Sequence, residues 1–107
     1  MMYAGLTPKY LALVHQMNEN AIQTWQTKGG MHTTLSFIVG ISDVAGLLDI
    51  LSSLLESGRS ASSIFFKDWE TGLLHVTLID PEPGEDASLK ARCASANIKL
   101  YSPSLEK

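Results

Sequence analysis

The stretch GISDVAGLLDILSSLLESG, residues 40–58, decides the fold because it begins at the end of a strand-like segment and continues as a helix-like one. Its apolar residues recur every three or four positions, the spacing at which side chains share one face of a helix. Ser42 and Asp43 are residue types that cap helix N-termini, and a glycine often follows the last turn. We therefore predict a helix that begins after Gly40 and is closed by Gly58.

The segments around this helix alternate apolar and polar residues with a period of two, which is typical of strands. Glu70-Thr71-Gly72 separates two of them and predicts a hairpin, because glycine supplies the positive φ of a short turn. We predict strands at residues 32–39, 62–69, 73–79 and 98–102, and a second helix at residues 85–96. The resulting order, β-α-β-β-α-β, predicts an α+β fold, a ferredoxin-like antiparallel sheet with both helices on one face.

A further helix is predicted before this unit, at residues 8–27. Thr7 is a favoured N-cap and Pro8 a favoured first helical residue, and an apolar stripe follows at helical spacing. Met31 comes directly after two glycines and is a candidate internal start. We predict an amphipathic N-terminal helical appendage, residues 1–30, and a ferredoxin-like domain, residues 31–107.

The second and third predicted strands carry apolar residues on both faces of the sheet. Ile64 and Phe66 alternate with Phe65, and Leu73 and Ile79 fall opposite the other apolar residues of their strand. The predicted helices cover one face only, so the other face needs the N-terminal helix or a second subunit. We predict a homo-oligomer, a dimer or a larger assembly.

The composition excludes several classes of function. Eight Lys and Arg against 11 Asp and Glu give a net charge of −3, and the basic residues are scattered, which argues against nucleic-acid binding. With 45% hydrophobic and 18% charged residues, the chain is lightly charged for its 107 residues, as in proteins that bury surface in an oligomer. No apolar run predicts a membrane span, and the N-terminus has no signal-peptide pattern, so we expect a cytoplasmic protein.

The start of the helix after Gly40 resembles ACT domains, small regulatory modules. Their usual pattern has Asp, two residues, Gly, one residue and Leu, which Asp43, Gly46 and Leu48 match, while Ala45 stands where proline is common. The resemblance continues to about residue 80. It implies a non-catalytic module that binds an amino-acid-like small ligand between paired domains.

In such domains, main-chain groups at the equivalent of Gly40, Ser42, Asp43, Ala45 and Gly46 hold the polar head of the ligand. This role agrees with physical chemistry, because free N–H groups at a helix N-terminus favour an anion and glycine allows close approach. The alternative is that Ser42 and Asp43 only cap the helix and Gly46 only relieves crowding. Both interpretations are open from the sequence.

Two other classes of function compete with a regulatory module. His75 and Thr77 alternate on one strand and so share a sheet face, where they could line a polar pocket. Dimeric α+β-barrel enzymes of the monooxygenase and isomerase type use such a pocket, with a histidine as acid or base. The third class is a protein-interaction module whose uncovered sheet face binds another protein.

The remaining reactive side chains indicate no catalytic or cofactor site. Cys93, the single cysteine, excludes an internal disulfide and is predicted to be a buried core residue, with a persulfide carrier of the DsrE type as the alternative. The three histidines lack metal-ligand spacing, and the acidic residues between Glu82 and Asp86 are predicted to form a solvated turn. We predict no metal and no cofactor.

Overall fold

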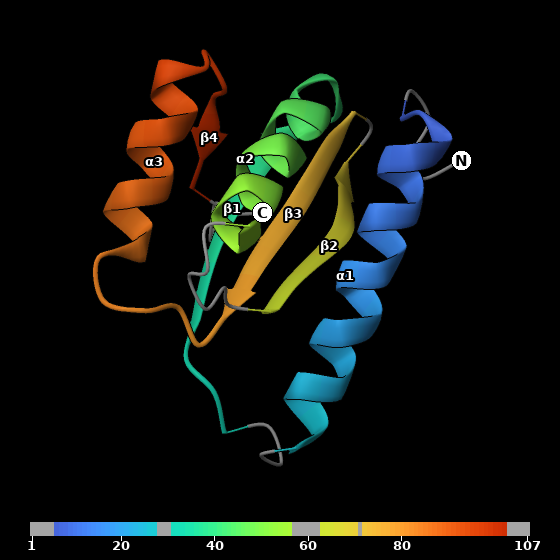
Figure 1. Cartoon of the computed structure of the whole chain (residues 1–107), viewed down its shortest axis with the longest axis vertical. Helices are drawn as coiled ribbons and strands as arrows, with labels where there is room; N and C mark the ends of the chain where they lie inside the picture. The colour runs from blue at the N-terminus through green and yellow to red at the C-terminus, as the bar shows by residue number, and fades with distance from the viewer. Residues whose placement is uncertain (1–5, 28–30, 57–62, 71, 103–107) are drawn as a thin grey trace.

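The computed structural model describes residues 6–27, 31–56, 63–70 and 72–102, and these residues form an α+β fold (Figure 1). In chain order the elements are α1 (Pro8–Thr27), β1 (Thr34–Gly40), the short 3-10 helix η1 (Ile41–Asp43), α2 (Val44–Glu56), β2 (Ser63–Glu70), β3 (Leu73–Ile79), α3 (Glu85–Ser95) and β4 (Leu100–Tyr101). The predicted α+β class, with its β-α-β-β-α-β order after the first helix, is therefore confirmed.

The four strands form one antiparallel sheet in the order β2-β3-β1-β4. Strand β3 lies between β2 and β1, and β4 pairs with the free side of β1. The hairpin between β2 and β3 turns at Gly72, whose φ of +79° lies in the left-handed region that glycine adopts without steric cost. This register places alternate residues of every strand on opposite faces of the sheet.

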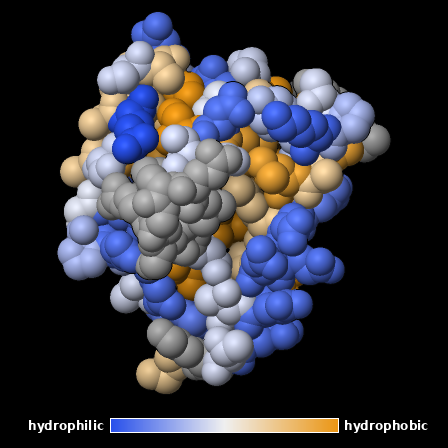
Figure 2. All heavy atoms as spheres, viewed as in Figure 1, coloured by the Kyte–Doolittle hydropathy of each residue, from blue (hydrophilic) through white to orange (hydrophobic). Residues whose placement is uncertain are grey.

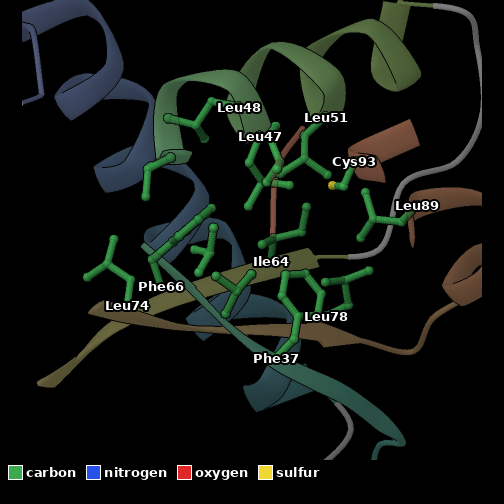
Figure 3. Packing of buried hydrophobic residues seen from close by; sticks show 14 of the residues in the cluster. Phe37, Leu47, Leu48, Leu51, Ile64, Phe66, Leu74, Leu78, Leu89 and Cys93 are labelled. Carbon is green, nitrogen blue, oxygen red and sulfur yellow. The ribbon is translucent and has the colours of Figure 1, made fainter. Parts of the chain in front are cut away.

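One face of the sheet forms the core together with α2 and α3 (Figure 3). Phe37 and Val39 of β1 lie opposite Val76 and Leu74 of β3, and Phe66 of β2 lies opposite Val76 from the other side. The helices add apolar side chains that are almost fully buried: Val44, Leu47, Leu48, Leu51, Leu89 and Cys93. The described part of the predicted apolar stripe of the central helix therefore packs on the sheet.

Helix α1 runs alongside β2, at the edge of the sheet (Figure 1). Val14 enters the same core as α2, and the Asn18 Oδ1 atom accepts a hydrogen bond of 2.7 Å from the Phe66 backbone N–H. Nearer its C-terminal end, the Thr24 and Ser63 hydroxyls lie 2.7 Å apart. Figure 2 shows that the outer side of this helix is hydrophilic. Helix α1 therefore covers the edge of β2 and packs on the core, while the division into parts 1–30 and 31–107 stays a prediction.

Element ends differ from the predictions at the C-terminal side. The last strand is only Leu100–Tyr101, shorter than the predicted 98–102, and α3 ends at Ser95. Asn97 has a φ of +60°, a left-handed conformation that asparagine tolerates, and it directs the chain from α3 back to the sheet. Ala96, the last residue of the predicted helix, lies after the end of α3 and is exposed. Gly58, predicted to close the central helix, lies outside the described residues.

Candidate functional site

The sheet face that points away from α2 and α3, called here the outer face, carries a mixture of apolar and polar side chains. The strand register arranges these side chains in rows across the sheet. The first row is Ser63, Ile79 and Thr34; the second is Phe65, Thr77 and Ser36; the third is Lys67, His75, Ile38 and Tyr101. The prediction that β2 and β3 carry apolar residues on both faces is confirmed by Phe65 and Ile79, which lie outside the core cluster.

A cavity of about 340 Å³ lies between α1 and the first two rows of the outer face. Its walls are mostly apolar, with aromatic rings on both the helix side and the sheet side. The lining residues are Ala21, Ile22, Trp25 and Gln26 from α1, and Thr34, Phe65, Thr77 and Ile79 from the sheet. A cavity of this size, apolar with a few polar groups, has the general character of small-molecule sites.

The polar groups of this cavity are hydroxyls and one amide. The Thr77 Oγ1 atom lies 3.3 Å from the Ser36 Oγ atom, so the two hydroxyls form a cross-strand hydrogen bond in the second row. Thr34 and Gln26 supply the other polar side chains. None of the described lining residues is an acid, a base or a thiol, so the cavity wall can bind a ligand but has no group that transfers a proton readily near neutral pH.

His32 and Asp80 hold the C-terminal end of α1 against the end of the sheet. The His32 Nδ1 atom lies 2.6 Å from Asp80 Oδ2, and the His32 Nε2 atom lies 3.2 Å from the Trp25 carbonyl oxygen. The His32 ring also stacks on the Trp25 ring, with centroids 4.9 Å apart. Asp80 is fixed in turn, because its backbone N–H donates to the Thr33 carbonyl and its Oδ1 atom accepts from the Thr33 N–H. These contacts position Trp25 as one wall of the cavity.

His75 and Thr77, the predicted pocket residues, take different positions. Thr77 lines the cavity, whereas His75 lies in the adjacent third row, opposite Lys67. Partial burial lowers the pKa of His75, and the positive charge of Lys67 lowers it further, because both disfavour the imidazolium form. The structure therefore brings Thr77 to the cavity and places a basic pair, Lys67 and His75, beside it.

Large hydrophobic side chains are exposed around the cavity and across the outer face. Ile22 is 49% exposed and Trp25 is 42% exposed at the cavity rim, and Tyr101 is 50% exposed at the far end of the third row. Met31, just before β1, is 80% exposed. Exposed apolar groups that gather on one side of a small domain mark an interaction surface.

The predicted ligand loop, Gly40 to Gly46, forms the passage from β1 to α2. Ser42 and Asp43 belong to the 3-10 helix η1, and Gly40 takes the N-cap position with no side-chain capping hydrogen bond. The loop is attached to the sheet through the Ile41 N–H, which donates to the Gly72 carbonyl oxygen at 2.8 Å. The outer-face cavity is lined by other residues. Ligand binding by this loop stays a prediction.

Gly46 has a packing role that is visible in the structure. A Cβ atom at this position would come 3.0 Å from the Cδ1 atom of Ile98, which is buried between α3 and β4. The absence of a side chain therefore allows α2 to approach the segment before β4. Ser42 is exposed, while Ala45 and Asp43 are partly buried. The interpretation of Gly46 as a residue that relieves crowding thus has a named partner.

Cys93 and the acidic turn are accounted for by packing. Cys93 is 1% exposed, and burial together with the charge of Asp43 raises the pKa of its thiol, which disfavours the reactive thiolate. Glu85, predicted to be solvated, is buried instead, and its Oε1 atom accepts a hydrogen bond of 2.8 Å from the Glu82 N–H. Within the part of the chain that the structure describes, no cluster of His, Cys, Asp and Glu could hold a metal ion, and no helix could cross a membrane.

Sequence reasoning missed the cavity because no single segment contains it. Its walls come from the second half of α1 and from three strands that the topology brings beneath that helix. One local signal was present: Ile22 and Trp25 continue the apolar stripe of α1 beyond the turns that the core needs.

A comparison with protein-family models finds no match, and comparisons with the curated proteins and with the solved structures find no match to this chain either.

Proposed function

We propose that this protein is a non-catalytic module that binds a small, largely apolar, amino-acid-like ligand and acts as a homo-oligomer. The observation that carries the proposal is the cavity of about 340 Å³ between α1 and the outer face. We also propose that its fold is ferredoxin-like and related to ACT domains. The β-α-β-β-α-β order and the strand order β2-β3-β1-β4 support this assignment.

The chemistry of the cavity wall favours binding over turnover. Trp25 and Phe65 offer aromatic surfaces, and Thr77 and Gln26 offer hydrogen bonds that can orient a ligand. General acid–base catalysis would need a titratable group within hydrogen-bond reach of the substrate. His75 is the nearest titratable candidate in the strand register, but it lies in the third row and does not line the cavity. The enzyme alternative is therefore the weaker proposal.

The exposed apolar groups support a homo-oligomer. A second copy placed on the outer face would cover Ile22, Trp25 and Tyr101 and would add a further wall to the cavity. Removing these side chains from water stabilises an assembly by roughly 25 cal/mol per Å² of apolar surface buried. A regulatory module in which subunits share a ligand surface would respond to the ligand through assembly or through the arrangement of subunits.

The test is a thermal-shift and calorimetric screen of the intact chain with L-phenylalanine, L-leucine and the neutral 3-phenylpropan-1-ol. We expect at least one of them to raise the melting temperature, because a ligand that binds only the folded state stabilises it. The Thr34→Trp variant should lose this response, since an indole at that exposed lining position would occupy the cavity. Gln23→Trp is the matched control, because Gln23 is exposed on α1 but does not line the cavity.

The same screen separates the cavity from the loop predicted by the ACT resemblance. Ser42 is exposed in η1, so Ser42→Trp crowds that loop without entering the core. Binding that is lost in Ser42→Trp and kept in Thr34→Trp would move the ligand to the loop. No response to any compound, in a variant set that folds normally, would contradict a small-molecule function and favour the protein-interaction alternative.

A further inference from the structure

We infer that the ligand is an apolar monocarboxylate, with its apolar body in the cavity between α1 and the outer face and its carboxylate at the neighbouring Lys67–His75 pair. This inference rests on the proposed function and specifies the chemical class of its ligand. Three features of the structure carry it: the rows of the sheet, the charges on the outer face and the polarity of the cavity wall.

The spacing of the rows fits a short amphipathic molecule. Phe65 and Thr77 face each other in the second row and line the cavity, and Lys67 and His75 face each other in the next row. Neighbouring residues on one face of a strand are two positions apart, which is about 7 Å. A ligand whose ring contacts Phe65 therefore needs only a short linker to bring a polar group to Lys67.

The charges on the outer face favour an anion at this position. Lys67 is exposed and His75 is partly buried, and they lie directly opposite each other on adjacent strands. Partial burial and the positive charge of Lys67 lower the pKa of His75, so the imidazolium form is disfavoured while no anion is nearby. A carboxylate bound between them would attract the Lys67 ammonium, would favour protonation of His75, and could accept charge-assisted hydrogen bonds.

The three rows of the outer face offer no anionic partner for an ammonium group on the ligand. Among the described residues of the three rows, Lys67 and His75 are basic and none carries a carboxylate. The cavity wall adds hydroxyls, one amide and apolar surface. An α-amino group would therefore lose hydration without gaining an anionic partner. Recognition should depend on the carboxylate and should tolerate removal of the amine.

The experiment measures dissociation constants by isothermal titration calorimetry for 3-phenylpropanoate, 3-phenylpropanamide and L-phenylalanine. We expect the carboxylate to bind about fivefold more tightly than the isosteric amide, the size of effect that one partly solvated ion pair produces. It should also bind at least as tightly as L-phenylalanine. In Lys67→Met the preference for the carboxylate over the amide should disappear while affinity for the amide is unchanged.

Lys90→Met is the matched control. The Lys90 side chain is 59% exposed on α3, away from the outer face, and forms an ion pair of 3.2 Å with Asp86, so removing this charge should leave the preference intact.

Two results would overturn the inference in different ways. Equal affinity for the carboxylate and the amide, with both lost in Thr34→Trp, would show that the cavity binds apolar molecules but that Lys67 selects no anion. A carboxylate preference that survives in Lys67→Met would place the anion elsewhere. Failure of all three compounds to bind the wild-type chain would overturn both this inference and the proposed function.

Discussion

Gly46 lies in the first turn of α2, where a helix-stabilising residue such as alanine would ordinarily be preferred by about 1 kcal/mol. The position is constrained from outside the helix, because an added Cβ atom would meet Ile98 at 3.0 Å. The glycine that matches the ACT pattern is thus also needed for packing. A substitution at Gly46 changes the core before it changes any ligand contact.

We predict that Gly46→Leu destabilises the fold by about 1–3 kcal/mol, the usual cost of overpacking a core. The measurement is urea unfolding followed by circular dichroism. Ser53→Leu places the same side chain at an exposed position of α2 and should change the stability by less than about 0.5 kcal/mol. An unchanged unfolding midpoint for Gly46→Leu would show that Ile98 moves aside freely, contrary to this account.

Helix α1 protects the edge of β2, an element-scale problem that every open sheet has to solve. An uncovered edge strand presents backbone groups that can pair with another chain. Here the Asn18 side chain accepts the Phe66 N–H at 2.7 Å, and Thr24 contacts Ser63 two turns further along the helix. Helix α1, which the sequence predicts as an amphipathic appendage, is held to the sheet by these polar contacts as well as by the packing of Val14 in the core.

We predict that Asn18→Ala lowers the free energy of unfolding by about 0.5–1.5 kcal/mol, because it removes the hydrogen bond to the β2 backbone. Asn20→Ala is the matched control: Asn20 is exposed on the same helix, and its replacement should have little effect. Both variants can be compared by chemical denaturation. Equal stabilities for the two variants would mean that the edge contact contributes nothing to the attachment of α1.

At the scale of the whole molecule, the outer face is the side of the sheet that a single chain covers only in part. Its core-side counterpart is covered by α2 and α3, whereas Ile22, Trp25 and Tyr101 remain between 42% and 50% exposed. A face that is partly apolar and partly polar agrees with a surface that meets a ligand and a second subunit. The His32–Asp80 contact keeps the α1 wall of the cavity in place for either role.

We predict that the chain is at least a dimer in solution, with a mass of twice 11.6 kDa or more by light scattering. Ile22→Glu should shift this mass towards that of the monomer, because a charge at the rim would have to be desolvated in the assembly. Gln23→Glu is a suitable control, since Gln23 is a neighbouring exposed residue of α1 that does not line the cavity. A monomeric wild-type chain would contradict the oligomer proposal.

Local patterns in the sequence determined most of the elements and the face of each that is buried. Pro8 and Thr7 mark the start of α1 at the observed residue, and Leu73 to Ile79 form β3 as predicted, because capping, turn chemistry and periodicity act over a few residues. The tertiary structure alone decided where α1 lies, why Gly46 is small and where the cavity is. These features depend on contacts such as Asn18 with Phe66 and Gly46 with Ile98, which join residues about 50 positions apart and leave no periodic signal in the chain.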